Sequence, residues 1–121
     1  MHEVSLMQNL LEVVASTARR EGGEKVNVIH LKIGELSGVN RDSLEFAFEV
    51  LKKGTVAEEG KLEIERVPLR VRCKDCGADF SPTDLIFRCE SCGSSNLEIV
   101  SGREMEIDYI LMDDEEDGDG G

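Results

Sequence analysis

Two pairs of cysteines, spaced C-x2-C-x12-C-x2-C, restrict the fold of this chain more than any other feature of its sequence. They are Cys73, Cys76, Cys89 and Cys92, and a glycine follows each pair. Residues 71–77 also resemble residues 87–93, so the segment contains a short internal repeat. In a C-x-x-C-G knuckle the glycine lets the backbone turn back, so that its N–H groups can face the sulfur atoms. The pattern therefore predicts a metal site with four sulfur ligands.

Four thiolates favour a tetrahedral ion, and Zn²⁺ is the first expectation, with iron as its nearest competitor. Four protein ligands leave no coordination position for a substrate or a water molecule, which indicates a structural rather than a catalytic ion. Binding of structural zinc contributes about 10–16 kcal/mol in small peptides, enough to fold a short module with little core. The alternatives are two disulfides or buried free thiols, and both the spacing and a reducing cytosol disfavour them.

The composition narrows the compartment and the classes of partner. The chain of 121 residues has a net charge of -12, and residues 1–112 still carry -6 without the acidic tail. An acidic body repels phosphate groups, so nucleic acid is not expected as a partner. The amino terminus lacks a secretory signal, and no apolar stretch reaches the roughly 20 residues that span a bilayer. We therefore expect a cytoplasmic protein with no membrane partner.

Two segments outside the cysteine region have the pattern of amphipathic helices. In residues 4–20, the apolar side chains recur at helical spacing, and two glycines follow. The apolar side chains of that stripe are Leu6, Leu10, Val13 and Val14, with Met7 and Leu11 beside them. Asn40 is a good N-cap for a second helix, which is expected to end near residue 53.

Three further segments predict the strands of one sheet, because they are rich in Val and Ile or alternate between apolar and charged residues. They are residues 25–33, 61–67 and 103–111. The expected fold class is α+β: two helices with a three-stranded sheet, into which a zinc ribbon with four cysteine ligands is inserted. The expected domains are residues 1–67 plus 103–112, the zinc ribbon at 68–102, and a disordered acidic tail at 113–121.

The amino terminus is a second candidate metal site. It begins Met1, His2, Glu3, and the large side chain at position 2 implies that the initiator Met is retained. The α-amine, the deprotonated backbone amides of His2 and Glu3, and the His2 ring could supply four nitrogens in a plane, an arrangement that suits Ni²⁺ or Cu²⁺. From spacing alone this signal is weak, because a His at position 2 is more often part of a frayed terminus.

Several motifs occur in order along the chain: the Met1, His2, Glu3 start, a long first helix, IGELSGV at residues 33–39, the two knuckles, and SGREM at residues 101–105. Over about residues 1–112 the chain resembles the HypA/HybF family, the nickel metallochaperones of NiFe-hydrogenase maturation. The resemblance implies that residues 1–67 plus 103–112 form a nickel-binding α/β domain. It implies His2 as the essential Ni²⁺ ligand, with the Met1 amine and the Glu3 backbone amide beside it, and it implies Cys73, Cys76, Cys89 and Cys92 as Zn²⁺ ligands.

The same resemblance implies two partners, the GTPase HypB and the precursor of the hydrogenase large subunit, and some members of the family also serve urease. A homodimer is left open. No nucleophile–base pair and no P-loop motif is identifiable in the sequence, so we expect a protein that is not an enzyme. Any nucleotide hydrolysis is then the work of a partner.

Other residues that could bind metal are not expected to do so. His30 lies in the middle of a strand with no flanking Cys or second His, and it is expected to be a satisfied strand residue rather than a ligand. The remaining acidic residues lie on the polar sides of alternating strands, which are usually solvated faces. They are Glu63, Glu65, Glu104, Glu106 and Asp108.

Two other functions are compatible with paired knuckles. A rubredoxin-like electron carrier would hold one iron, but the large α/β body and the scarcity of aromatic residues argue against it. A zinc-ribbon module that binds nucleic acid is the other, and the acidic charge argues against that.

Overall fold

The structure, a computed structural model, describes residues 2–84 and 86–114, except for the side chains of His2 and Asp114. The chain forms two compact units. The first consists of Met1–Leu31, Val39–Glu65 and Glu106–Gly121, and the second of Lys32–Gly38 and Arg66–Met105. The domain limits expected from the sequence remain a prediction. In the described residues, no helix combines the length and apolarity that crossing a bilayer requires.

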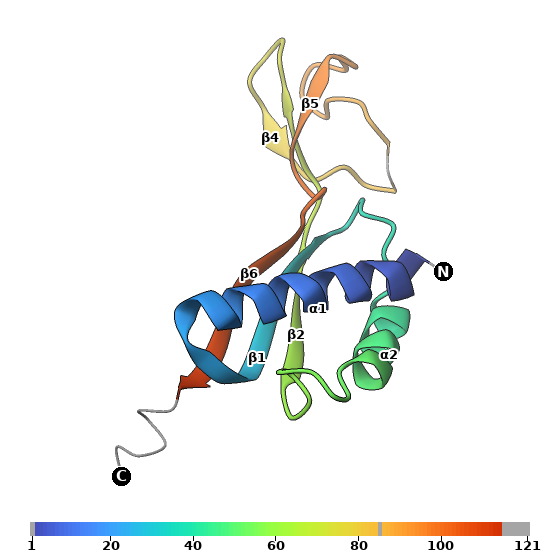
Figure 1. The fold of residues 1–121 in the computed structure, drawn as a ribbon. Coiled ribbons are helices and arrows are strands. Elements are labelled where there is room, and N and C mark those ends of the chain that lie inside the picture. Colours follow the sequence, from blue (N-terminus) through green and yellow to red (C-terminus); the bar gives the residue numbers. More distant parts are fainter. Residues whose placement is uncertain (1, 85, 115–121) are drawn as a thin grey trace. The chain divides into compact units, whose positions relative to one another are not determined.

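The predicted helices and the predicted sheet are all present. The helices are α1 (His2–Glu21) and α2 (Arg41–Leu51), and a three-stranded sheet has the order β2-β1-β6. Its strands are β1 (Gly23–Gly34), β2 (Lys61–Val67) and β6 (Met105–Asp114). Figure 1 shows α1 lying across these strands. The expected α+β class is therefore confirmed.

One row of side chains on α1 provides its contribution to the core of the first unit. The buried residues are Met7, Leu11, Val14 and Ala18, which follow one another at three or four positions and so form a straight row on the helix. The stripe expected from the sequence was centred one residue earlier. Val13, which belongs to that stripe, is 53% exposed. Ala18, which the expected stripe did not include, continues the row that contains Met7 and Leu11.

The ends of both helices are fixed by local interactions. Gly22 has φ +76°, a left-handed conformation that ends α1 as predicted. Asn40 is the N-cap of α2, and its side-chain oxygen accepts a hydrogen bond from the backbone N–H of Ser43 at 2.8 Å. The backbone N–H of Asn40 in turn donates to the carboxylate of Glu3 at 3.1 Å. The first turn of α1 is thereby connected to the start of α2.

The sheet has one face with buried side chains and one that is largely exposed. On β1, Ile29 and Leu31 are buried, so His30 between them points to the other face. Tyr109 of β6 stacks on His30 and is 44% exposed. The strand β6 extends through Asp113 and Asp114, which the sequence analysis assigned to the disordered tail. Residues 115–121 of that tail lie outside the described residues.

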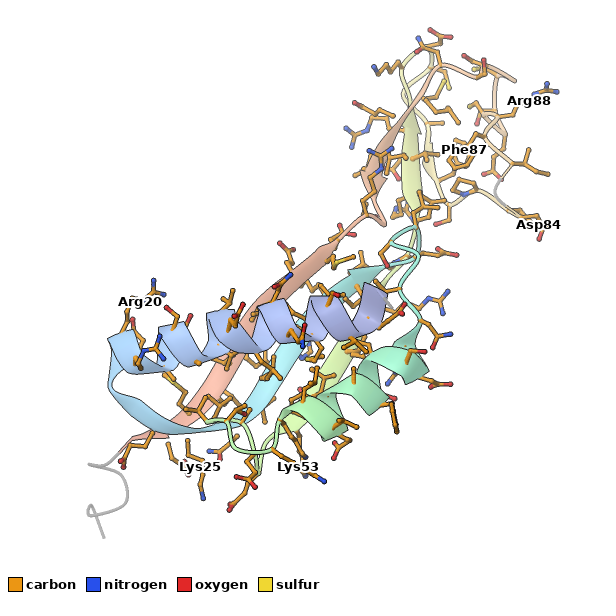
Figure 2. All side chains as sticks on the ribbon, turned by 45° about the vertical axis from the view of Figure 1, so that its right-hand side comes forward. Arg20, Lys25, Lys53, Asp84, Phe87 and Arg88 are labelled. Carbon is orange, nitrogen blue, oxygen red and sulfur yellow. The ribbon has the colours of Figure 1, made fainter. Side chains whose placement is uncertain are left out.

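The second unit contains a small antiparallel sheet with the order β4-β3-β5. Its strands are β3 (Arg70–Cys73), β4 (Asp79–Phe80) and β5 (Leu97–Ser101). In β3, Val71 is paired with Phe80 of β4, and Cys73 with Leu97 of β5. The loop between β4 and β5 carries Asp84, Phe87 and Arg88 (Figure 2).

Residues 34–36 of the motif at 33–39 are hydrogen-bonded to two other segments of the second unit. The backbone N–H of Gly34 donates to the carbonyl of Glu104 at 2.7 Å, and that of Leu36 donates to the carbonyl of Gly102 at 2.7 Å. Glu35 has two such contacts: its N–H donates to the carbonyl of Val67, and its carboxylate accepts from the N–H of Leu69 at 2.8 Å. A Cβ atom at Gly34 would overlap the carbonyl group of Gly102, so only glycine allows this approach.

We predict that Gly34→Ala destabilises the protein far more than Gly38→Ala. The first substitution forces backbone apart and is expected to cost about 3 kcal/mol or more. The second adds a Cβ at φ +77° in open space, which is expected to cost about 1–2 kcal/mol. Urea unfolding followed by circular dichroism measures both. An insoluble Gly34 variant agrees with the prediction, and equal losses in the two variants contradict it.

Candidate metal centre

The four cysteines predicted to bind metal lie together in the second unit. The sulfur atoms of Cys73 and Cys92 are 3.6 Å apart, and those of Cys76 and Cys89 are 3.5 Å apart. All four lie within 4.8 Å of one another. A metal–sulfur distance of about 2.3 Å places the sulfurs of a tetrahedral site about 3.8 Å apart. The observed cluster therefore suits one tetrahedral ion with sulfur ligands.

The internal repeat of the sequence is a repeat of local structure. Gly77 has φ +81° and Gly93 has φ +76°, so both knuckles turn back after their second cysteine. The N–H of Gly77 donates to the carbonyl of Cys73 at 2.8 Å, and the N–H of Gly93 donates to that of Cys89 at 2.9 Å. As expected from the C-x-x-C-G pattern, the glycines make these turns possible.

Backbone N–H groups of each turn face the first cysteine of the pair. The N–H groups of Ser91 and Cys92 donate to the sulfur of Cys89 at 3.4 and 3.5 Å. The hydrogen bond from Cys92 is the main reason that the pKa of Cys89 falls to about 7. The backbone of Cys76 has the same effect on Cys73, whose pKa is also lowered. The first cysteine of each pair is thus prepared to be a thiolate.

The second cysteine of each pair behaves in the opposite way. The Ser94 N–H lowers the pKa of Cys92, but hydrogen bonding with the Cys73 thiol and burial outweigh it and raise the pKa to about 12. The pKa of Cys76 is likewise raised, because the Cys89 thiol and burial outweigh a hydrogen bond from Ala78. Four sulfurs this close cannot all ionise without a cation, so a metal ion would replace the protons that the second cysteines retain.

A polar bracket that sequence reasoning missed holds the two knuckles together. The hydroxyl of Ser94 donates to the carboxylate of Asp75 at 2.5 Å, and the side-chain amide of Asn96 donates to the same carboxylate at 3.2 Å. The Ser94 hydrogen bond, followed by that of Asn96, lowers the pKa of Asp75. The only sign of this bracket in the sequence is a difference between the two copies of the repeat: Asp75 in the first copy corresponds to Ser91 in the second.

The second predicted site, at the amino terminus, is described only in part. Met1 and the side chain of His2 lie outside what the structure describes, so their expected role as nickel ligands stays a prediction. The backbone of His2 begins α1, and Glu3 is in its first turn. The Glu3 carboxylate accepts the hydrogen bond from Asn40, which leaves the backbone of Glu3 as its expected contribution to a metal site.

A second group of side chains of the types that can bind metal lies around His30 in the first unit. Its Nδ1 lies 3.1 Å from the Glu63 carboxylate, and its Nε2 lies 3.0 Å from Glu65 and 3.9 Å from Asp108. Both ring nitrogens thus have partners, as the sequence analysis expected for His30. The carboxylates, however, converge on one imidazole rather than simply facing solvent. This convergence could not be predicted from the sequence, because it depends on β2 and β6 lying on either side of β1 in the sheet.

The chain matches known proteins over almost its whole length. A family model described as "Hydrogenase/urease nickel incorporation, metallochaperone, hypA" matches residues 1–112. The hydrogenase maturation factor HypA of Roseiflexus sp. (strain RS-1) is 41% identical over 116 residues, covering 95% of this chain and 94% of that protein. The factor of the same name from Chlorobaculum tepidum is 42% identical over 107 residues, covering 88% and 95%.

Two solved structures have the same fold. The solution structure of the Ni metallochaperone HypA from Helicobacter pylori matches with a TM-score of 0.68 and 29% identity, covering 93% of this chain and 98% of that chain. Another solution structure of a HypA protein matches with a TM-score of 0.73 and 30% identity, covering 95% and 98%. These matches support a nickel metallochaperone and not the alternative of a rubredoxin-like electron carrier. The resemblance seen in the motifs is confirmed, and the chain belongs to the HypA family of nickel metallochaperones, which act in hydrogenase maturation.

Proposed function

We propose that this chain binds Ni²⁺ at its amino terminus and releases it to the precursor of the NiFe-hydrogenase large subunit, with the GTPase HypB as a partner. The observation that carries the proposal is the family match, which begins at residue 1 and so includes the Met1, His2, Glu3 start. We propose His2 as the essential ligand, through its ring and backbone nitrogens. The Met1 amine and the Glu3 backbone amide complete a planar set of four nitrogens.

A planar site of this kind requires a change in local structure. In α1 as observed, successive backbone nitrogens are about 100° apart around the helix axis and do not converge on one point. Binding through the nitrogens of His2 and Glu3 therefore requires the first turn of α1 to unwind. Helix ends open easily, so this change is compatible with an ion that must be bound and later released.

For the second unit we propose that Cys73, Cys76, Cys89 and Cys92 hold a structural Zn²⁺. The distances between the sulfur atoms and the N–H groups that face them support this assignment. A closed site of four thiolates also keeps soft ligands away from the transported ion. The chain then has no catalytic role of its own, and we place it in the cytoplasm, where thiols stay reduced.

Substitution of a zinc ligand tests the structural role of the cysteines. We predict that Cys92→Ser loses zinc and the dispersed NMR signals of the second unit, since three ligands hold the ion less tightly and the core is small. Glu90→Gln, in the same knuckle, is the matched control and is expected to keep both. Elemental analysis and a ¹H–¹⁵N spectrum provide the measurements. A metal-free Cys92 variant with an unchanged spectrum contradicts the prediction.

Substitution of His2 tests the nickel site. We predict that His2→Gln removes the nickel bound at the amino terminus and leaves zinc and the fold intact. Glu3→Gln is expected to retain this nickel, because only the backbone of Glu3 is proposed as a ligand. The protein is made without an amino-terminal tag, and nickel titration is combined with elemental analysis. If the His2 variant keeps the same nickel stoichiometry as the wild type, the assignment is wrong.

An amino-terminal extension tests the α-amine. We predict that one added Gly-Ser before Met1 strongly weakens nickel binding at this site, because it converts the amine into an amide. The same two residues added after Gly121 are the control and are expected to have no effect. Isothermal titration with Ni²⁺ compares the two proteins. Equal affinities show that the amine is not a ligand.

A further inference from the structure

We propose that His30, Glu65 and Asp108 form a further binding site for a divalent transition-metal ion, on the exposed face of the β2-β1-β6 sheet. All three residues belong to the first unit. The site is distinct in residues and in donor type from the four sulfurs and from the amino terminus. It does not rest on the function proposed above.

The three ligand atoms are close enough to bind one ion. They lie within 4.8 Å of one another, with Nε2 of His30 at 3.0 Å from the Glu65 carboxylate and 3.9 Å from that of Asp108. Nitrogen and oxygen ligands at about 2.1 Å from a metal are about 3.0–3.4 Å apart when adjacent. Glu65 already satisfies this spacing, and a small rotation of the Asp108 side chain brings its carboxylate into range.

The imidazole of His30 is held in the orientation that a ligand needs. Its Nδ1 lies 3.1 Å from the carboxylate of Glu63, the arrangement in which a carboxylate orients a metal-binding His from behind. With the proton on Nδ1, the lone pair of Nε2 faces Glu65 and Asp108. Tyr109 stacks on the ring with centroids 4.7 Å apart and an interplanar angle of 4°, which fixes the plane of the imidazole. The His30 side chain is only 17% exposed.

Charge also favours a divalent ion. Three carboxylates surround one imidazole, so a proton on His30 leaves the group at -2, and a divalent ion on the neutral ring leaves it at -1. Hydrogen bonds from His30 to Glu65 and then Glu63 raise the pKa of the imidazole, so a proton and a metal ion compete for the same group. The competing possibility is an imidazolium held by carboxylates with no metal, and the experiment below separates the two.

The ligand set indicates the class of ion. One imidazole and two carboxylates suit Ni²⁺, Co²⁺, Zn²⁺ and Mn²⁺, in contrast to thiolates, which select softer ions. Three protein ligands leave coordination positions for water. Such a site is expected to bind more weakly than the closed cysteine site and to exchange its ion readily.

Tyr109 provides a direct readout of this site. It is the only tyrosine of a chain without tryptophan, and its ring lies against His30. Ni²⁺, with its open d shell, quenches the fluorescence of an adjacent phenol, whereas Zn²⁺ does not. We therefore titrate Ni²⁺ into the full-length His2→Gln protein, which lacks the proposed ligand at the amino terminus but keeps zinc. We expect saturable quenching with one Ni²⁺ bound, and its reversal by excess Zn²⁺.

Isosteric variants in the same His2→Gln background identify the ligands. Asp108→Asn and Glu65→Gln are each expected to weaken the Ni²⁺ affinity at least tenfold, and Glu63→Gln about 10–100-fold through its effect on the ring. Glu106→Gln removes the same charge two residues from Asp108 on β6, and it is expected to leave the affinity within twofold. His30→Gln is expected to abolish the saturable quenching, and the carboxylate variants keep the test valid if that protein folds poorly.

Two results overturn the proposal. One is quenching that does not saturate, and the other is an equal effect of Asp108→Asn and Glu106→Gln. Either result identifies the group around His30 as an ion-pair network without a metal. The proposed nickel site at the amino terminus is tested separately, by the nickel that wild type loses on His2→Gln. Failure of one proposal is therefore distinguishable from failure of the other.

Discussion

The second unit is built around the convergence of four sulfur atoms. Among its described residues, the core cluster has five that are buried, and two of them, Cys73 and Cys89, are themselves proposed ligands. The proposed metal site and the hydrophobic core therefore overlap in these two residues. In this unit the Cys92 N–H lowers the pKa of Cys89, whereas the Cys73 thiol and burial raise that of Cys92 against a hydrogen bond from Ser94. A bound ion would replace the protons that the second cysteines retain and so allow four thiolates.

Much of the fold and the sulfur cluster could be predicted from the sequence, because both depend on local patterns. Helical periodicity identified α1 and α2, richness in Val and Ile identified β1, and alternation identified β2 and β6. The spacing of the cysteines identified the cluster. The prediction failed where tertiary pairing decides. The buried row on α1 lies one residue from the expected stripe and includes Ala18, a small residue that the apolar pattern did not single out. The bracket from Asp75 to Ser94 and the carboxylates around His30 join residues far apart in sequence, and only strand and turn geometry brings them together.

The glycines of the chain illustrate the same limit. Gly77 and Gly93 were predicted to matter because the knuckle pattern contains them. Gly34 is part of the motif that indicated the family, but its physical role is visible only in the structure, where the backbone of Gly102 leaves no room for a side chain. A motif can therefore be recognised from the sequence long before the contact that requires it is known.

In the function proposed above, the chain holds Zn²⁺ permanently and Ni²⁺ temporarily, and differences in affinity order alone do not separate these two ions. Donor type and the number of ligands can separate them. Four thiolates leave no position for an incoming ligand, so exchange is slow, whereas the nitrogen ligands proposed at the start of α1 can be lost one at a time as the helix re-forms. The site proposed around His30 would add a third donor set, with one nitrogen and two carboxylates. An ion bound there could pass to another protein by ligand exchange. That transfer would not require the cysteine site to open or close.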